Sequence, residues 1–232
     1  MEFGCGSGAM ITIPLARLGW RMIGLDSDEG SVGYGRRLLA THGLDPEIIR
    51  RALLVDLEIQ PDVIIASEVL EHLPEAVLSD TLEQMRRTLK PSGTLLVTVP
   101  NGYGWFELES FLWRRTGVGA LLEWMRGSRG IVALKRRLFG ADPGPHPSTL
   151  AHSPHVQRFT LRSICSRLEA HGFAIRETRG SVLACGPFSN LVLTRPGGLM
   201  RLNATAGTRF PRVAAGFFVC ATSGRDQPGR SA

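Results

Sequence analysis

The sequence predicts an α/β protein built on a doubly wound, mostly parallel sheet. Short apolar runs alternate with segments of helical spacing along most of the chain. Glycine or polar residues follow several of these apolar runs directly. Because parallel strands end at the same edge of a sheet, these residues are expected to line one crevice, where open α/β sheets bind their ligands.

A glycine turn stands near the start of the chain. Gly4, Gly6 and Gly8 follow the end of a predicted first strand. Without a Cβ, these residues can turn sharply and bring backbone N–H groups close to a ligand. Asp26 follows the next predicted strand, about 20 residues further on, where an acid can accept both hydroxyls of a ribose. The combination predicts a nucleoside-containing cofactor.

Beyond this turn, segments in which apolar residues have helical spacing continue to alternate with short apolar runs typical of strands. Helical spacing predicts helices over Met10–Leu18, Gly30–His42, Ala76–Leu89 and Thr160–Leu168. Apolar runs predict strands over Arg21–Leu25, Ala52–Val55, Val63–Ala66, Thr94–Val99, Phe173–Arg179 and Phe217–Ala221. Residues 186–212 are rich in Pro, Gly and Arg, and we expect a loop or a short helix there.

The first strand is short for a buried strand. Only Met1 and Phe3 are apolar ahead of the glycine turn, where roughly four to six apolar residues are expected. We therefore expect the N-terminus to be truncated, through a misassigned start codon or because the chain is a fragment.

Four blocks of sequence resemble the class I S-adenosylmethionine-dependent methyltransferases. They are Glu2–Gly8, Leu54–Leu57, Asp62–Leu73 and Leu89–Asn101, in the order and spacing of that family. Glu2 favours this family over dinucleotide-binding proteins, because a carboxylate repels a pyrophosphate but suits an ammonium and a sulfonium. The pattern is similar to small-molecule enzymes of the ubiquinone-pathway O-methyltransferase kind. It implies a seven-stranded Rossmann-like fold that binds S-adenosyl-L-methionine.

The resemblance implies roles for residues at the strand ends. Gly4–Gly8 would wrap the methionine portion, and Asp26 would take the ribose hydroxyls. Asp56 would accept from the adenine amino group, with Leu57 beside the ring and Ser67 near the sulfonium. The predicted cofactor-binding residues are Glu2, Gly4, Cys5, Gly6, Gly8, Asp26, Ser27, Asp56, Leu57 and Ser67. Asp26 and Asp56 could instead be solvated turn carboxylates, but both directly follow predicted strands.

A cluster of acids and a histidine follows the predicted strand Val63–Ala66. If the turn is helical, Glu68, Glu71 and His72 share one face and could bind a divalent ion, with His155 or His152 completing the set. Some relatives that resemble this pattern, including small-RNA 2′-O-methyltransferases and ubiquinone-pathway O-methyltransferases, use a metal there, whereas other relatives with the same residues are not known to need one. We predict no metal, because a capping Glu and a His acting as base explain the same residues.

His72 and His155 are the predicted catalytic residues. An imidazole with a pKa near ~6.5 can accept a hydroxyl proton at neutral pH. Either residue could instead be an ordinary surface histidine.

Composition sets the broad class of the protein. The 232 residues, 43% of them hydrophobic, suffice for one globular domain with a sizeable core. The four cysteines are scattered, which indicates reduced thiols and a cytoplasmic location. No apolar run approaches the ~20 residues of a membrane-spanning helix, and peripheral membrane contact stays open.

The sequence divides into four segments. These are a cofactor-binding half (1–101), a helical insertion after the fifth strand (102–150), the C-terminal half of the sheet (151–224) and a disordered tail (225–232). The insertion interleaves large apolar side chains, most of them aromatic, with basic ones: Trp105, Phe106, Phe111, Trp113, Trp124 and Met125 with Arg114, Arg115, Arg126, Arg129, Lys135, Arg136 and Arg137. It is either a helical cap on the sheet or a lid that selects an amphiphilic or anionic acceptor.

We expect methyl transfer to an oxygen of a small molecule or of a glycan- or lipid-linked intermediate. A formal net charge of +6 keeps an RNA 2′-O-methyltransferase open, although the positive residues are spread along the chain and nucleic acid is not favoured as a partner. A non-catalytic, cofactor-binding paralogue is a third possibility, against which the intact glycine turn and Asp26 argue. The acceptor atom and the oligomeric state stay open.

Overall fold

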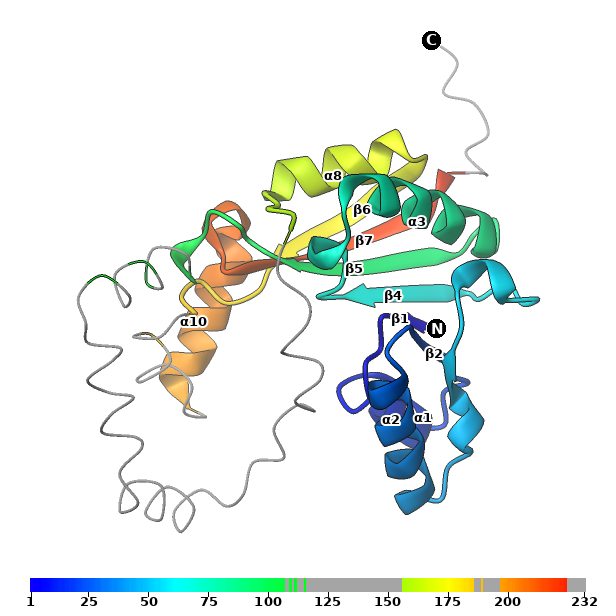
Figure 1. The fold of residues 1–232 in the computed structure, drawn as a ribbon. Coiled ribbons are helices and arrows are strands. Elements are labelled where there is room, and N and C mark those ends of the chain that lie inside the picture. The colour runs from blue at the N-terminus through cyan, green and yellow to red at the C-terminus, as the bar shows by residue number, and fades with distance from the viewer. Residues whose placement is uncertain are drawn as a thin grey trace, which may run out of the picture.

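The computed structural model describes residues 1–106, 156–185 and 197–224, together with the single residues 109, 111, 115 and 189. These residues form a seven-stranded sheet with the order β3-β2-β1-β4-β5-β7-β6 (Figure 1). The strands are β1 (Glu2–Phe3), β2 (Gly24–Asp26), β3 (Ile49–Arg51), β4 (Val63–Ser67), β5 (Thr94–Pro100), β6 (Phe173–Gly180) and β7 (Gly216–Ser223).

The sheet is mostly parallel, as predicted. The strands from β3 to β5 pair in parallel, and β7 runs antiparallel between β5 and β6. Strand β1 has only two residues, yet it pairs on both sides, with Glu2 opposite Gly24 of β2 and Ile65 of β4. The chain order reverses around β1, so the glycine turn lies at the switch point where open α/β sheets bind ligands.

Helices cover both faces of the sheet. They are α1 (Thr12–Arg17), α2 (Glu29–Thr41), α3 (Glu75–Thr88), α8 (Leu161–Ala170) and α10 (Gly198–Arg209). Figure 1 shows α3 and α8 together on one face, while α1 and α2 lie beside β1 and β2. Two separate core clusters follow this division: α3 and α8 pack over β4, β5 and β7, and α1 and α2 pack against Cys5 and Ile49.

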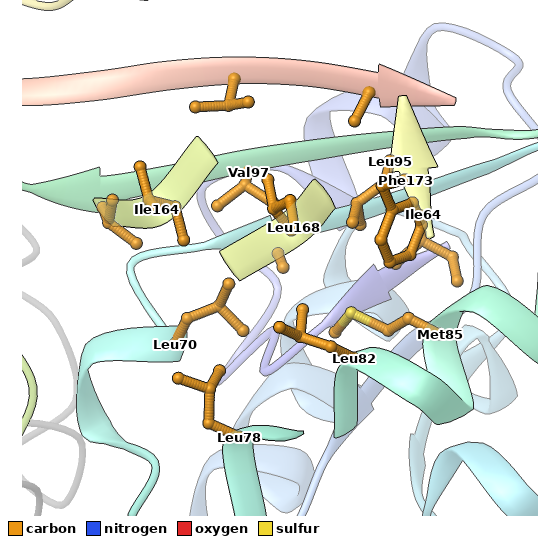
Figure 2. Packing of buried hydrophobic residues seen from close by; sticks show 14 of the residues in the cluster. Ile64, Leu70, Leu78, Leu82, Met85, Leu95, Val97, Ile164, Leu168 and Phe173 are labelled. Atoms are coloured by element: carbon orange, nitrogen blue, oxygen red, sulfur yellow. The ribbon is translucent and has the colours of Figure 1, made fainter. Parts of the chain in front are cut away.

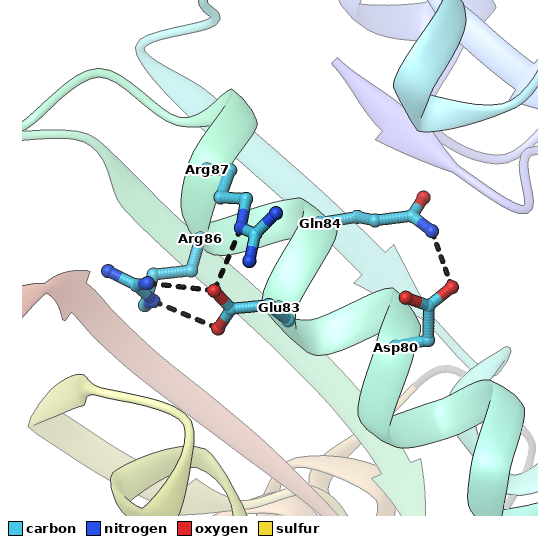
Figure 3. A network of polar contacts seen from close by, with 5 residues as sticks. All are labelled: Asp80, Glu83, Gln84, Arg86 and Arg87. Carbon is cyan, nitrogen blue, oxygen red and sulfur yellow. Dashed lines mark hydrogen bonds and ion pairs between the residues drawn. The ribbon is translucent and has the colours of Figure 1, made fainter.

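The larger core shows why α3 forms where helical spacing predicts it. Leu78, Leu82 and Met85 repeat at helical spacing and are fully buried against Ile64 and Val97 of the sheet (Figure 2). The opposite face of α3 is polar. There Glu83 accepts hydrogen bonds from Arg86 and Arg87, and Gln84 donates to Asp80 (Figure 3). The Arg86 hydrogen bond is the main cause that lowers the pKa of Glu83 to about 2.

The predicted strand Ala52–Val55 is wrong. Strand β3 ends at Arg51, and Leu54–Asp56 form a 3-10 helix (η2). The reason is local: the Leu53 N–H donates to Asp56 Oδ2 at 3.0 Å, which folds the chain into a turn instead of leaving that N–H for a neighbouring strand. The other strands and the four helices predicted in the described residues occur within a few residues of their expected bounds.

Residues 186–212 contain a longer helix than expected. Helix α10 spans 12 residues, and a 3-10 helix (η4, Pro211–Val213) follows it. Most of the predicted insertion over 102–150 and the whole tail over 225–232 lie outside the described residues. Within the described part of the chain, no helix combines the length and the apolar composition that crossing a bilayer requires.

Candidate functional site

The glycine turn after β1 has the backbone conformation that only glycine adopts freely. Gly4, Gly6 and Gly8 have φ angles of 68°, 53° and 69°. A Cβ on Gly4 would collide with Val69, and one on Gly8 would collide with Ile49. Close packing against Val69 and Ile49 therefore favours glycine at positions 4 and 8, in addition to the sharp turn and the approach of a ligand that the sequence predicts.

Asp26 and the glycine turn are brought together as predicted. Asp26 ends β2, and its Oδ2 accepts a hydrogen bond from the Gly6 N–H at 2.7 Å. Its Oδ1 accepts from the Asp28 N–H at 2.8 Å. Each oxygen thus has one backbone donor, which leaves each with further acceptor capacity. The carboxylate is held in one orientation at the edge of the sheet.

The side chain of Glu2 is buried, although a contact with a ligand at the surface would not require burial. It is 4% exposed, and its Oε2 accepts from the Thr12 N–H at 2.8 Å and from Thr12 Oγ1 at 2.5 Å. Helix α1 has no side-chain cap of its own at Ile11, so Glu2 satisfies the first N–H of that helix. Burial raises the pKa of Glu2 to about 7. Its cofactor contact stays a prediction, beside this structural role.

Two further predicted cofactor-binding residues are Cys5, in the glycine turn, and Ser27, next to Asp26. Cys5 is buried and packs in the core under α1 and α2, and burial raises the pKa of its thiol. An inert, protonated thiol suits a packing role, so any contact of Cys5 with a ligand falls to its backbone. Ser27 follows Asp26 directly and is exposed.

Asp56 lies further from its strand than predicted. Strand β3 ends at Arg51, and Asp56 is the last residue of η2, which follows that strand. Its Oδ2 accepts a hydrogen bond from the Leu53 N–H. Asp56 is exposed, and Leu57 packs partly against the larger core. In the described part of the chain, no hydrogen bond joins Asp56 to the glycine turn.

The turn after β4 starts with a strained residue. Ser67 Oγ lies 2.9 Å from Thr98 Oγ1, and this hydroxyl in turn donates to Glu68 Oε1 at 3.0 Å. Glu68 has a φ of 51°, and no other described non-glycine residue has a positive φ. Such strain concentrates at functional sites. Thr98 was missed from the sequence because its partners come from a different strand.

Glu71 is a buried carboxyl group without a hydrogen-bond partner. It lies on the 3-10 helix η3 (Leu70–His72), is 1% exposed, and neither carboxyl oxygen is hydrogen-bonded. Its Oε1 lies 3.9 Å from His72 Nε2, beyond hydrogen-bond range. Burial raises the pKa of Glu71 to about 8, and the charge of Glu68 adds to the effect. The sequence suggests acidic chemistry here but not this burial.

The turn does not present Glu68, Glu71 and His72 on one face. The helix begins after Glu68, which is exposed, while Glu71 is buried and the His72 side chain is 24% exposed. In the part of the chain that the structure describes, no three His, Cys, Asp or Glu residues are grouped so that they could hold a metal ion. The prediction that no metal is used stays a prediction.

His155 and His152 lie outside the described residues. The described segment that follows them contacts the turn after β4. The Val156 and Gln157 N–H groups donate to the Glu71 carbonyl oxygen at 2.9 and 3.0 Å. The assignment of His155 as a catalytic residue stays a prediction.

Aromatic side chains follow the end of β5, at the edge of the sheet where β1 and β4 also end. Tyr103, Trp105, Phe106 and Phe111 are all well exposed. Glu109 is buried and accepts hydrogen bonds from Trp105 Nε1 and from the Ser189 hydroxyl, which joins the segment after β5 to the segment after β6. Nothing in the local sequence pattern around Glu109 distinguishes it from a surface acid, so its burial was not predicted.

Comparison with known proteins agrees with this arrangement. The sequence model of the family described as "Methyltransferase domain" matches residues 1–178. Ubiquinone biosynthesis O-methyltransferase of Caulobacter vibrioides is 27% identical over 128 residues, which cover 54% of this chain and 48% of that protein. The protein of the same name from Ruegeria pomeroyi is 31% identical over 106 residues, which cover 44% of this chain and 40% of that protein. The chain thus spans about half the length of these relatives or less.

Solved structures share the fold. The magnesium protoporphyrin IX methyltransferase of Synechocystis PCC 6803, with bound SAH, superposes with a TM-score of 0.51 at 17% identity, over 95% of this chain and 72% of that chain. The geranyl diphosphate C-methyltransferase of Streptomyces coelicolor A3(2) superposes with a TM-score of 0.53 at 13% identity, over 96% and 72% of the two chains. The predicted Rossmann-like fold is confirmed. Because the family model covers more than half of the sequence, this chain belongs to the methyltransferase domain family.

Proposed function

We propose that the chain binds S-adenosylmethionine at the glycine turn and transfers its methyl group to an oxygen of a small molecule or of a glycan- or lipid-linked intermediate. The observation that carries the proposal is the hydrogen bond from the Gly6 N–H to Asp26 Oδ2. It holds a turn with left-handed backbone beside a carboxylate at the switch point of the sheet. That combination suits a nucleoside with a charged tail.

The residues present fit this cofactor. Asp26 keeps acceptor capacity on both oxygens for a pair of ribose hydroxyls. Gly4, Gly6 and Gly8 shape the turn, and we assign the amino group of the base to Asp56, which is exposed. The cofactor supplies, when bound, a methyl group made electrophilic by its sulfonium. The chain therefore needs only to orient the acceptor and to manage its proton.

His72 is the residue that we propose for the proton. Its ring is partly exposed at the end of β4, where an acceptor above the sheet edge can reach it. Glu71, 3.9 Å away, would hold the His72 ring in place instead of supplying a negative charge, because its pKa of about 8 keeps it mostly protonated at neutral pH. Glu71 is thus a positioning residue.

The acceptor that we propose has an apolar part. Exposed aromatic rings of Tyr103, Trp105 and Phe106 stand at the end of β5 and can bury such a group. The relatives named for ubiquinone biosynthesis O-methylation support transfer to oxygen on a small molecule. The lid function of the insertion and the cytoplasmic location stay predictions.

The test of this function is a methyl-transfer assay on the full chain. Tritiated S-adenosylmethionine is offered with catechol as a minimal hydroxyl acceptor or with a pool of small RNA, with and without a chelator. We expect transfer to catechol that survives chelation and falls at least about tenfold in His72→Gln. Transfer to RNA that a chelator abolishes and a divalent ion restores would favour the RNA 2′-O alternative. Binding of S-adenosylhomocysteine with no transfer to either acceptor would favour the non-catalytic one.

A further inference from the structure

Helix α10 and η4 lie at the edge of the sheet that carries the candidate site. They connect the end of β6 at Gly180 to the start of β7 at Gly216, and Gly216 pairs with Pro100 at the end of β5. Asn101, just after β5, donates to the carbonyl oxygens of Ala214 and Arg212. Figure 1 shows α10 beyond the end toward which β4 points.

One side of α10 is fixed firmly to the protein. Gly207 is buried so closely against Ser181 that a Cβ there would overlap the Ser181 backbone. Asn203 Nδ2 donates to the Ala184 carbonyl oxygen at 2.7 Å, and Asn203 Oδ1 accepts from the Ala184 N–H at 2.9 Å. The helix therefore has a rigid inner side, and its outer side chains are not needed to hold it in place.

Large apolar residues along α10 and η4 contact little protein. They stand between 45% and 65% exposed: Leu199, Met200, Leu202, Phe210 and Val213. Leu199 and Leu202 are three residues apart, as are Phe210 and Val213, so each pair projects from neighbouring positions. Grouped exposed apolar residues of this kind mark interaction surfaces.

The charge of this surface has one sign. Arg201, Arg209 and Arg212 are exposed among the apolar residues. No Asp or Glu occurs anywhere in the sequence between Glu177 and Asp226. Arginine grips phosphate through paired N–H groups, and apolar side chains beside it can enter the acyl boundary of a bilayer. An anionic phospholipid surface matches both properties at once.

We propose that α10 and η4 (Gly198–Val213, hereafter the α10 surface) dock on the surface of an anionic phospholipid bilayer. The α10 surface lies flat on the membrane with Leu202 and Phe210 in the acyl boundary and the arginines at the phosphates. Docking there places the edge of the sheet with Ser67 and Asn101 near the bilayer. The inference does not depend on methyl transfer, since it concerns only this surface.

The test is flotation of the full chain with vesicles of stated composition. We expect binding to vesicles of phosphatidylcholine and phosphatidylglycerol in equal parts, weak binding to phosphatidylcholine alone, and loss of binding as salt rises. The double variant Arg201→Gln with Arg209→Gln should weaken binding by at least about tenfold. Leu202→Ser with Phe210→Ser tests the apolar contribution separately and should weaken it similarly.

A matched control changes the same residue types on the α3 and α8 face: Val77→Ser with Arg162→Gln, both exposed. It should bind vesicles like the parent. Equal binding of parent and α10 variants, or equal binding to neutral and anionic vesicles, would overturn the proposal. So would absence of vesicle binding together with a dimer by analytical ultracentrifugation that the α10 variants break, because the surface would then serve a second copy. Unchanged S-adenosylhomocysteine affinity in the variants keeps this result separate from the proposed function.

Discussion

Strands β1 and β4 are neighbours in the sheet, but the polar groups at the turns that follow them differ in their hydrogen bonding. Asp26, at the end of β2, is hydrogen-bonded through both oxygens to backbone N–H groups, one of which belongs to Gly6 in the turn after β1. After β4, Glu71 is buried with neither oxygen hydrogen-bonded, and Glu68 holds a strained backbone. Burying an unpaired polar group and straining a backbone both cost stability. The polar groups at the first turn are therefore paired, whereas the second turn retains a cost in stability, which protonation of Glu71 reduces.

The largest expected effect breaks the first turn. Gly4→Ala combines a left-handed φ with a collision at Val69, and we expect it to destabilise the protein by about 2 to 4 kcal/mol. Thermal unfolding should show a Tm lower by roughly 10 °C. Gly19→Ala is the control, since Gly19 has a φ of 86° but nothing within 4 Å of a new Cβ. If both variants lose the same stability, the Val69 contact is not what requires glycine at position 4.

The second prediction concerns binding at the same turn. Asp26→Ala removes the acceptor of the Gly6 N–H and the proposed ribose contact, so affinity for S-adenosylhomocysteine should fall at least about tenfold by calorimetry. Asp28→Ala is the matched control. Asp28 caps α2 by accepting from Ser31 N–H, so its loss should cost about 1 kcal/mol of stability with little change in affinity. Equal affinities of Asp26→Ala and the parent would refute the cofactor assignment.

The third prediction concerns how the stability contributed by Glu71, in the turn after β4, depends on pH. The pKa of Glu71 is raised to about 8 in the folded state. Between its ordinary pKa and about pH 8, the folded protein therefore keeps a proton on Glu71 that the unfolded chain has already released. Stability from this group is present at low pH and is lost as pH rises toward about 8. Glu71→Gln removes that loss, so its Tm relative to the parent should rise by several degrees between about pH 5 and pH 8.5.

Glu75→Gln, on the next element, is the control for this pH effect. A hydrogen bond from Arg167 lowers the pKa of Glu75, so its contribution is present above its ordinary pKa and is lost as pH falls. Between about pH 5 and pH 8.5 the Tm of Glu75→Gln should therefore stay below that of the parent by a nearly constant amount, whereas the Tm of Glu71→Gln should rise relative to the parent. A constant Tm difference between Glu71→Gln and the parent across that range would show that Glu71 is not buried as the structure has it.

The smallest expected effect lies away from both turns. Glu83→Gln removes the exposed ion pairs with Arg86 and Arg87 on α3. Exposed pairs contribute little, so Tm at neutral pH should fall by no more than about 2 °C, and cofactor affinity should not change. A larger fall would mean that the polar face of α3 matters to the core more than the buried Leu78 and Leu82 suggest.

Local patterns predicted most of the fold. The buried runs of β4 and β5 and the spacing of α3 are properties of short stretches, so they are visible without the structure. The exception at Ala52–Val55 shows the limit. There a side chain, Asp56, competes for the Leu53 N–H, and apolar composition carries no trace of that competition. The extent of α10 was likewise missed, because Asn203 and Gly207 secure it through distant partners.

For the site, the sequence by itself determined which chemical groups stand at the strand ends, since strand ends follow from apolar periodicity. It identified the glycine turn, Asp26 and the acids after β4, and the prediction that the chain belongs to the methyltransferase family is confirmed. Only the tertiary structure decided how those groups are used: Glu2 caps α1, Gly4 and Gly8 make room for Val69 and Ile49, and Glu71 is buried without a hydrogen bond. The reason is physical. Burial and hydrogen bonding depend on which distant segments meet, and a linear pattern does not record these meetings.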